Sequence, residues 1–394
     1  PYTELERTYH YQYFSFRSHT TDNKKVKYII ENAGDTSYSK AWEEATVFFS
    51  RTINDPNSWK RQLDTSYDEN GNISWTQKGS GYFCYFPPYS YSRHLDLIDK
   101  CNAAASITTT MSLGKTLDDR DIDCVKVGQG DKICWIIHRQ HPGESMAEYF
   151  AEGLIERLLR VGRSSVDDDD DELIITKQAL EKYTFYIVPN MCIDGSVRGH
   201  LRTNAKGHNL NREWAASSSS KNSNYEAPTL ERSPEVYYVL QKMDETGVDA
   251  FLDIHGDEVL PFNFLAGGEG LPNWYPRLQS LHGAFLASYE RANSDMQRIH
   301  GYEPEPPNDA ALNICSNQIG YRFDCFSATL EMPFNDCRTN PDPKQGWSPA
   351  RAKRLGASIL HPLLYIYPYL RDQTDFWNHL PKEDDYVCPT PNYK

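Results

Sequence analysis

Apolar residues divide the chain into two parts with different periodicities. From Tyr9 to about Tyr91, aromatic and polar residues alternate, and turn-forming residues separate the alternating runs. A period of two is typical of half-buried strands, and Asp68-Glu-Asn-Gly-Asn predicts a hairpin loop. We therefore expect an antiparallel β-sandwich over residues 1–95, which the pair Pro87-Pro88 closes.

The second part, residues 96–380, consists of short apolar runs that alternate with longer segments of helical periodicity. Such an order predicts an α/β fold, in which a sheet carries helices on both faces. Apolar runs predict strands at residues 133–137, 184–188, 250–254 and 327–331, and the helical period predicts helices at 146–161, 234–246 and 349–364.

Two polar segments interrupt this second part. Six consecutive acids at residues 167–172 form a run of like charge, which indicates a solvated loop far more often than a cation site. Residues 217–224 are rich in serine and asparagine, and we expect them to form a flexible loop.

Charge and cysteine content narrow the function classes. The chain has 41 basic and 55 acidic residues, a formal net charge of −14, so nucleic acid and anionic membranes are disfavoured as partners. Nine scattered cysteines indicate reduced thiols rather than a disulfide scaffold. Without a signal peptide or an apolar run of about 18 residues, we expect a cytoplasmic protein. The chain opens on Pro1 rather than methionine, so the sequence leaves open whether a leader has been removed.

Three residues at predicted strand ends suggest a metal site. His141 and Glu144 follow one apolar strand, and His255 directly follows another. Two imidazoles and one carboxylate leave a tetrahedral position for water, which is typical of a catalytic zinc site. We therefore predict one zinc ion per chain. His138 should face the opposite side of its strand and serve the structure or the outer shell of the site.

Two further segments offer groups for hydrolysis. Glu331 ends an apolar strand, where it is a candidate general base for a metal-activated water. Arg202 and Arg212 lie in one polar loop, and guanidinium groups suit carboxylates and oxyanions. A strand-end acid and loop arginines are more often solvent-exposed, and only the zinc set reverses that preference.

Four motifs resemble those of the zinc carboxypeptidases of the carboxypeptidase A clan, in the order HPGES, NLNREW, DIHG and TLEMP. The likeness is strongest to the cytosolic carboxypeptidase subfamily, which includes deglutamylating enzymes. HYQYFSFR and CYFPPYSY in the N-terminal half are similar to the β-sandwich that precedes the catalytic domain there. The resemblance extends to about residue 370 and implies an α/β/α catalytic domain with a mixed central sheet.

The resemblance also implies a role for each matching residue. These residues are the zinc ligands His141, Glu144 and His255, the oxyanion-binding Arg202, the carboxylate-binding Asn211 and Arg212, and the general base Glu331. A tyrosine that closes over substrate is expected between His255 and Glu331. Tyr302 and Tyr321 both qualify, and we take Tyr321 as the substrate-binding residue.

The activity implied is hydrolysis of the C-terminal peptide or isopeptide bond of peptides and proteins. Subfamily likeness suggests a preference for acidic C-terminal residues, with Arg322 as the cation that would bind them. Two alternatives stay open, namely a zinc amidohydrolase that cleaves N-acyl amino acids and a peptide-binding module without catalysis. The natural substrate and the oligomeric state are not predicted.

Overall fold

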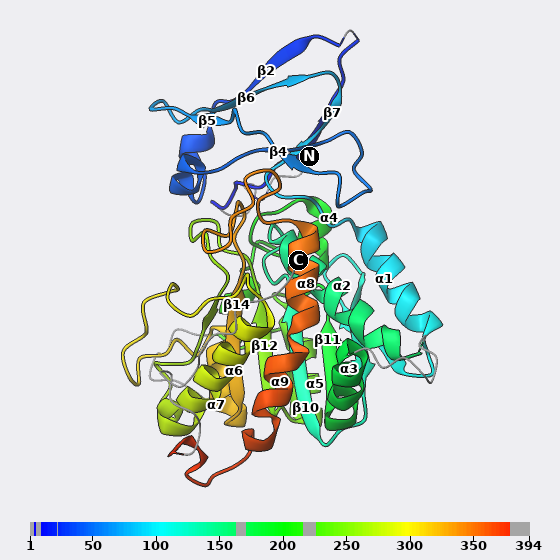
Figure 1. Ribbon diagram of the computed structural model, residues 1–394, viewed down its shortest axis with the longest axis vertical. Helices are drawn as coiled ribbons and strands as arrows, with labels where there is room; N and C mark the ends of the chain where they lie inside the picture. Colours follow the sequence, from blue (N-terminus) through cyan, green and yellow to red (C-terminus); the bar gives the residue numbers. More distant parts are fainter. Residues whose placement is uncertain (1–3, 5–8, 22, 163–170, 216–225, 379–394) are drawn as a thin grey trace.

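The computed structural model describes residues 4, 9–21, 23–162, 171–215 and 226–378, which form two stacked parts (Figure 1). The N-terminal part contains two antiparallel sheets, as the alternating pattern predicts. The first has the order β1 (Ser15–Ser18), β7 (Gly81–Cys84), β3 (Phe48–Ser50), β4 (Lys60–Arg61). The second has the order β2 (Lys25–Ile30), β6 (Ile73–Lys78), β5 (Ser66–Tyr67).

Aromatic rings join these two sheets into a sandwich. Phe83 of β7 has its ring centroid 5.5 Å from Trp75 of β6 and 4.6 Å from Tyr28 of β2. The predicted hairpin connects β5 and β6, where Tyr67 pairs with Ile73. The Asp68 carboxylate closes its loop by accepting hydrogen bonds from two backbone N–H groups, at 3.0 and 2.9 Å.

The second part is built around a seven-stranded mixed sheet. Neighbouring strands β14, β12, β10 and β11 are parallel, whereas β13, β9 and β8 pair in antiparallel fashion. The order is β13 (Phe264–Ala266), β14 (Phe326–Glu331), β12 (Ala250–Ile254), β10 (Lys132–His138), β11 (Tyr183–Val188), β9 (Asp121–Val127), β8 (Thr108–Lys115). All four predicted strands are confirmed, together with the mixed character of the sheet.

Helices cover both faces of this sheet, which confirms the α/β/α prediction (Figure 1). They are α1 (Tyr91–Ala103), α2 (Ser145–Leu159), α3 (Asp171–Lys182), α4 (Ile193–Arg198), α5 (Pro234–Thr246), α6 (Gln279–Ala292), α7 (Cys315–Phe323), α8 (Pro349–Ser358), α9 (Leu360–Ile366). The helix expected at 349–364 is divided into α8 and α9. Pro362 has no N–H to donate to the carbonyl of Ser358, so the break falls at Ile359.

Alternating side chains of β10 pack into two separate hydrophobic cores. Cys134 and Ile136 join the core under α2, α6, α8 and α9, whereas Trp135 and Ile137 join the core under α5 and α7. Such a strand must be apolar on both faces, which explains the continuous apolar run in its sequence.

The two polar segments lie partly or wholly outside the described residues. Asp171 and Glu172, predicted as loop, instead begin α3, where acids favour the positive end of the helix dipole. Residues 167–170 and 217–224 are not described. Eight cysteines in the described ranges are free and buried, as the reduced-thiol prediction requires. Within these ranges, every helix is too short or too polar to span a membrane.

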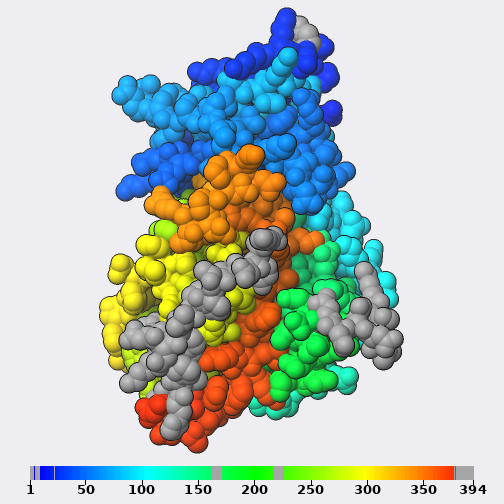
Figure 2. All heavy atoms as spheres, in the orientation of Figure 1, coloured from blue at the N-terminus to red at the C-terminus, as the bar shows by residue number. Residues whose placement is uncertain are grey.

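The N-terminal sandwich sits on the sheet domain through the chain that follows Glu331 (Figure 2). The ring of Tyr85 stacks on Phe334 with centroids 4.7 Å apart. Asn335 accepts a hydrogen bond from the Thr46 N–H at 3.0 Å, and Asp336 lies 3.3 Å from the Arg61 guanidinium. The predicted boundary at residue 95 falls inside α1.

A buried charge network ties α1 to the sheet domain. His94 of α1 donates from Nδ1 to Glu148 of α2 at 2.7 Å and from Nε2 to Asp123 of β9 at 3.0 Å. Glu148 also accepts from Arg139 at 2.6 Å and from Asn190 at 2.9 Å. Burial opposes protonation of His94, but its two carboxylate partners outweigh burial and raise the pKa to about 9.

We expect His94 to make the stability of the fold depend on pH. Because the pKa rises from 6.5 unfolded to about 9 folded, the stabilisation is complete below pH 6.5 and is lost as pH rises through 9. The loss amounts to about 3 kcal/mol. Urea unfolding at pH 6 and pH 9.5 should show this extra loss in the wild type and not in His94→Gln. Equal pH dependence in both proteins would contradict the assignment.

Candidate metal centre and active site

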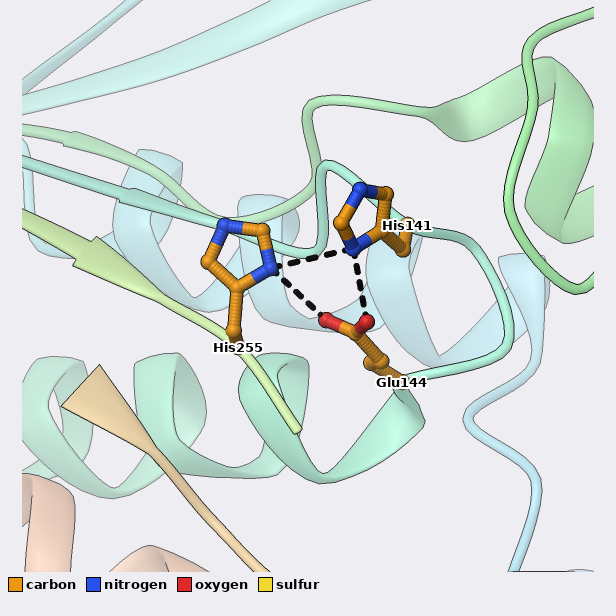
Figure 3. Close-up of side chains that lie close together, drawn as sticks. All are labelled: His141, Glu144 and His255. Atoms are coloured by element: carbon orange, nitrogen blue, oxygen red, sulfur yellow. Dashed lines mark hydrogen bonds and ion pairs between the residues drawn. The ribbon is translucent and has the colours of Figure 1, made fainter. Parts of the chain in front are cut away.

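Three side chains converge on one point at the edge of the central sheet (Figure 3). His141 Nδ1 lies 2.7 Å from Glu144 Oε1, and His255 Nδ1 lies 2.9 Å from Glu144 Oε2. The two Nδ1 atoms are 3.2 Å apart. All three side chains are buried, and their ligand atoms lie within 4.8 Å of one another, so one ion can contact all three.

The outer nitrogens of both imidazoles are held by hydrogen-bond acceptors. His255 donates from Nε2 to Asp253 Oδ2 at 2.9 Å, and His141 donates from Nε2 to Asn209 Oδ1 at 3.0 Å. These bonds place the proton on Nε2 and leave the Nδ1 lone pair free for a metal. Two neutral imidazoles and one carboxylate with such partners fit zinc.

The loop that carries His141 and Glu144 is fixed by its neighbours. Arg139 takes a left-handed backbone conformation with φ 57°, which turns the chain sharply after β10. Its buried guanidinium donates to the Pro142 carbonyl at 2.9 Å. Gly143 donates its N–H to the Leu201 carbonyl at 2.8 Å, and a Cβ at residue 143 would lie 2.8 Å from that oxygen. Only glycine allows this close approach.

The cavity in front of the metal ligands has a volume of about 600 Å³. It brings together most of the residues singled out in the sequence. Its described lining includes His141, Glu144, Arg202, Asn211, Arg212 and Glu331. These residues face one space, although 190 residues separate His141 from Glu331 in the chain.

Glu331 ends β14 and is buried beside the metal ligands. Its Oε1 lies 3.1 Å from the Tyr302 hydroxyl, whereas the buried Oε2 has no hydrogen-bond partner among the described residues. Burial, with Glu144 and Asp257 nearby, raises the pKa of Glu331 well above its ordinary value. A carboxyl group with one unsatisfied buried oxygen is suited to exchange a proton with water in the cavity.

The two arginines lie at different depths. Arg202 is half-buried, and its guanidinium lies 5.9 Å from the ring centre of Tyr38. Burial alone would lower the pKa of Arg202, but Tyr38 and Glu144 outweigh it and keep the side chain cationic. Arg212 is exposed and donates to the Asn211 carbonyl at 2.7 Å.

Asn211 is buried between Arg212 and the metal ligands. Its Oδ1 accepts a hydrogen bond from the Cys315 N–H at 2.9 Å, and its Nδ2 lies 3.5 Å from His255 Nε2. Because the oxygen is engaged, the amide side chain can offer a donor beside the cavity.

Tyr302, and not Tyr321, lies at the cavity. Its hydroxyl is 2.6 Å from Asp257 Oδ2, and its side chain is among the described lining residues. Tyr321 is an exposed residue of α7 that is absent from this lining. Helical periodicity turned it to the surface, so its assignment to substrate binding is corrected.

Arg322 is likewise turned away from the cavity. It forms a two-pronged ion pair with Asp244 of α5, at 2.8 and 2.6 Å, on the surface of the sheet domain. The cation that the sequence pattern missed is Arg298, which lines the cavity and lies 3.2 Å from Glu290. Arg298 follows no strand and belongs to no motif, so only the fold reveals it.

His138 has the structural role that strand geometry predicted. Its Nδ1 donates to the Val188 carbonyl of β11 at 2.9 Å, and burial lowers its pKa to about 3. Asp253 and Asn209 were missed as partners of the zinc ligands. Asp253 could have been found, because it lies two residues before His255 and alternation puts both on one face of the strand.

Two family models match the chain. The model described as zinc carboxypeptidase covers residues 94–338, and the model described as cytosolic carboxypeptidase N-terminal domain covers residues 3–87. An uncharacterised protein of Zymomonas mobilis is 41% identical over 89% of this chain and 86% of its own length. Cytosolic carboxypeptidase 6 of Mus musculus is 25% identical over 47% of this chain and only 33% of its own length.

Solved structures match almost the whole chain. A metallo-carboxypeptidase from Pseudomonas aeruginosa, in complex with (2-guanidinoethylmercapto)succinic acid, is 37% identical with a TM-score of 0.81. It matches over 92% of this chain and 91% of that one. A metallo-carboxypeptidase from Burkholderia cenocepacia is also 37% identical with a TM-score of 0.81, over 91% and 90%. The chain therefore belongs to the zinc carboxypeptidase family.

Proposed function

We propose that this chain removes the C-terminal residue of peptides or proteins, with a preference for acidic residues. The observation that carries the proposal is the cavity, in which two of the three metal ligands, a base with an unsatisfied oxygen and two arginines meet. Each group supplies a function that the others lack.

The reaction is hydrolysis, and Glu331 handles its protons. Zinc, held by His141, Glu144 and His255, would polarise the scissile carbonyl and lower the pKa of water. Glu331 Oε2 accepts a proton from the attacking water and returns it to the leaving amine. The unsatisfied Oε2 suits both steps, because it can accept the proton from water and hold it until the amine leaves.

Arg202 and Arg212 act on different groups of the substrate. Arg202 stands beside the metal ligands and stabilises the negative charge that develops on the carbonyl oxygen. Arg212, with Asn211, binds the C-terminal carboxylate and so selects chain ends over internal bonds.

Arg298 is proposed to bind the acidic side chain of the substrate's C-terminal residue. With Arg202 and Arg212 assigned to the backbone of the substrate, it is the third arginine in the described cavity lining. Its pair with Glu290 leaves the side chain 28% exposed, so a substrate carboxylate can reach it. The acids Glu269 and Glu305 also line the cavity. Burial raises the pKa of both carboxyl groups, which favours their neutral form and so weakens their repulsion of an acidic side chain.

Two alternatives can be tested in one panel. A deacylase would cleave N-acyl amino acids faster than peptides, and a binding module would hold peptides without releasing amino acids. The likeness to cytosolic carboxypeptidases supports a cytoplasmic location, which stays a prediction.

Replacing the base should separate catalysis from metal binding. We expect Glu331→Gln to retain one zinc per chain and to lose about 10²- to 10⁴-fold in kcat, because the amide cannot accept the proton. Zinc analysis and release of free amino acid from peptides measure the two properties. Unchanged turnover would rule out this role for Glu331.

The hydrogen bond from His255 to Asp253 should strengthen metal binding. In Asp253→Asn the charge that supports the imidazole is gone, so we expect zinc affinity to fall by about 10- to 100-fold. Competition with a chelator measures the affinity, and Asp244→Asn on the surface serves as the matched control. Equal affinities in the two variants would exclude a role for Asp253.

Removing the cavity cation should change side-chain preference. We expect Arg298→Ala to reduce the preference for C-terminal glutamate over leucine, measured as a ratio of kcat/KM, by about tenfold or more. Arg322→Ala, which removes a surface arginine, should keep the wild-type ratio. A wild-type enzyme with no acidic preference would refute this part of the proposal alone.

A further inference from the structure

A carboxylate from the N-terminal part reaches the loop that carries Arg202. Glu4 accepts hydrogen bonds from three consecutive backbone N–H groups, those of Leu201, Arg202 and Thr203, at 2.7, 3.0 and 2.6 Å. The Glu4 side chain is only 4% exposed. Charge-assisted bonds to three successive amides fix a backbone conformation far better than one bond does.

The same loop is pinned from its other side by the metal-binding loop. The Leu201 carbonyl accepts the hydrogen bond from Gly143, next to the zinc ligand Glu144. Residue 201 therefore bonds to Glu4 through its N–H and to the zinc loop through its carbonyl. The backbone beneath Arg202 is held between the two parts of the molecule.

The guanidinium of Arg202 has its own support from the N-terminal part. Tyr38 faces it with 5.9 Å between Cζ and the ring centre, a distance at which a cation and an aromatic face attract. The Tyr38 N–H donates to Gln12 Oε1 at 2.8 Å, and Gln12 Nε2 donates to the Tyr85 hydroxyl at 3.1 Å. Tyr38 also lines the cavity, so this support borders the substrate space.

We infer that Glu4 and Tyr38 are positioning residues, through which the N-terminal part holds Arg202 where the oxyanion forms. The inference rests on the proposed function, because it needs Arg202 to act on the substrate. Arginine has a long, flexible side chain, and a displacement of about 1 Å can cost about 100-fold in rate. Glu4 fixes the backbone from which the Arg202 side chain extends, and Tyr38 fixes the position of its guanidinium.

A double-mutant cycle tests whether Glu4 acts through Arg202. We expect Glu4→Ala to lower kcat by about 10- to 100-fold with KM changed by less than about threefold. In the Arg202→Ala background the same change should lower kcat no further. Glu4→Asp keeps the charge and should recover part of the loss, whereas Glu31→Gln, at an exposed site of the N-terminal part, should match the wild type.

Tyr38 is tested through its ring. Because the ring face attracts the cation, we expect Tyr38→Phe to keep at least about tenfold more of kcat than Tyr38→Leu. Equal losses in the two variants would overturn the part of the inference that concerns Tyr38.

Two measurements separate a positioning role from general destabilisation. Zinc content and thermal midpoint should stay near wild type in Glu4→Gln, a variant of equal size that presents an amide donor to N–H groups. Hydrogen exchange of the amides of residues 201–203 should accelerate in that variant and not in Glu31→Gln. Unchanged exchange would overturn the inference, whatever the activity.

The outcomes also distinguish this inference from the proposed function. If the wild type releases C-terminal residues and Glu331→Gln does not, the proposed function stands. If Glu4→Ala then has the same effect with and without Arg202, only the positioning role of Glu4 is refuted. If the wild type releases none, the proposed function fails, and positioning for catalysis fails with it. Faster exchange at residues 201–203 would then describe only a structural contact.

Discussion

Three adjacent parallel strands end at the same edge of the central sheet, and the site depends on that alignment. In the register of β10, β12 and β14, His138 pairs with Ile254, and Ile254 pairs with Leu330. The next few residues deliver His141, His255 and Glu331 to one place. Because backbone hydrogen bonds fix this register, the fold itself aligns the metal ligands with Glu331.

The cost of this arrangement is a concentration of buried negative charge. Glu144, Glu258 and Glu331 are all buried near one another, and burial together with the Glu144 charge raises the pKa of both Glu258 and Glu331. Buried like charges repel strongly in a low dielectric. A bound zinc ion would relieve that repulsion. The affinity for the metal and the protonation of Glu331 therefore depend on the same charges.

Sequence patterns predicted whatever depends on local order. Alternation located the strands, and His141, Glu144, His255 and Glu331 follow directly from strand ends. Tyr321 and Arg322 were misplaced because nothing in the linear pattern says which face of α7 meets the cavity. Arg298 lies in irregular chain without a motif. Glu4 and Tyr38 lie more than 160 residues from Arg202, and their contacts exist only after the two parts dock.

One contact between the two parts lies three residues after Glu331. Phe334, Asn335 and Asp336 hold the N-terminal sandwich, while Glu331 on the same short stretch faces the cavity. Only Met332 and Pro333, both buried, lie between Glu331 and this contact. The docking surface of the sandwich and the lining of the cavity therefore share one short segment of chain, so a substitution that shifts Phe334 acts close to Glu331.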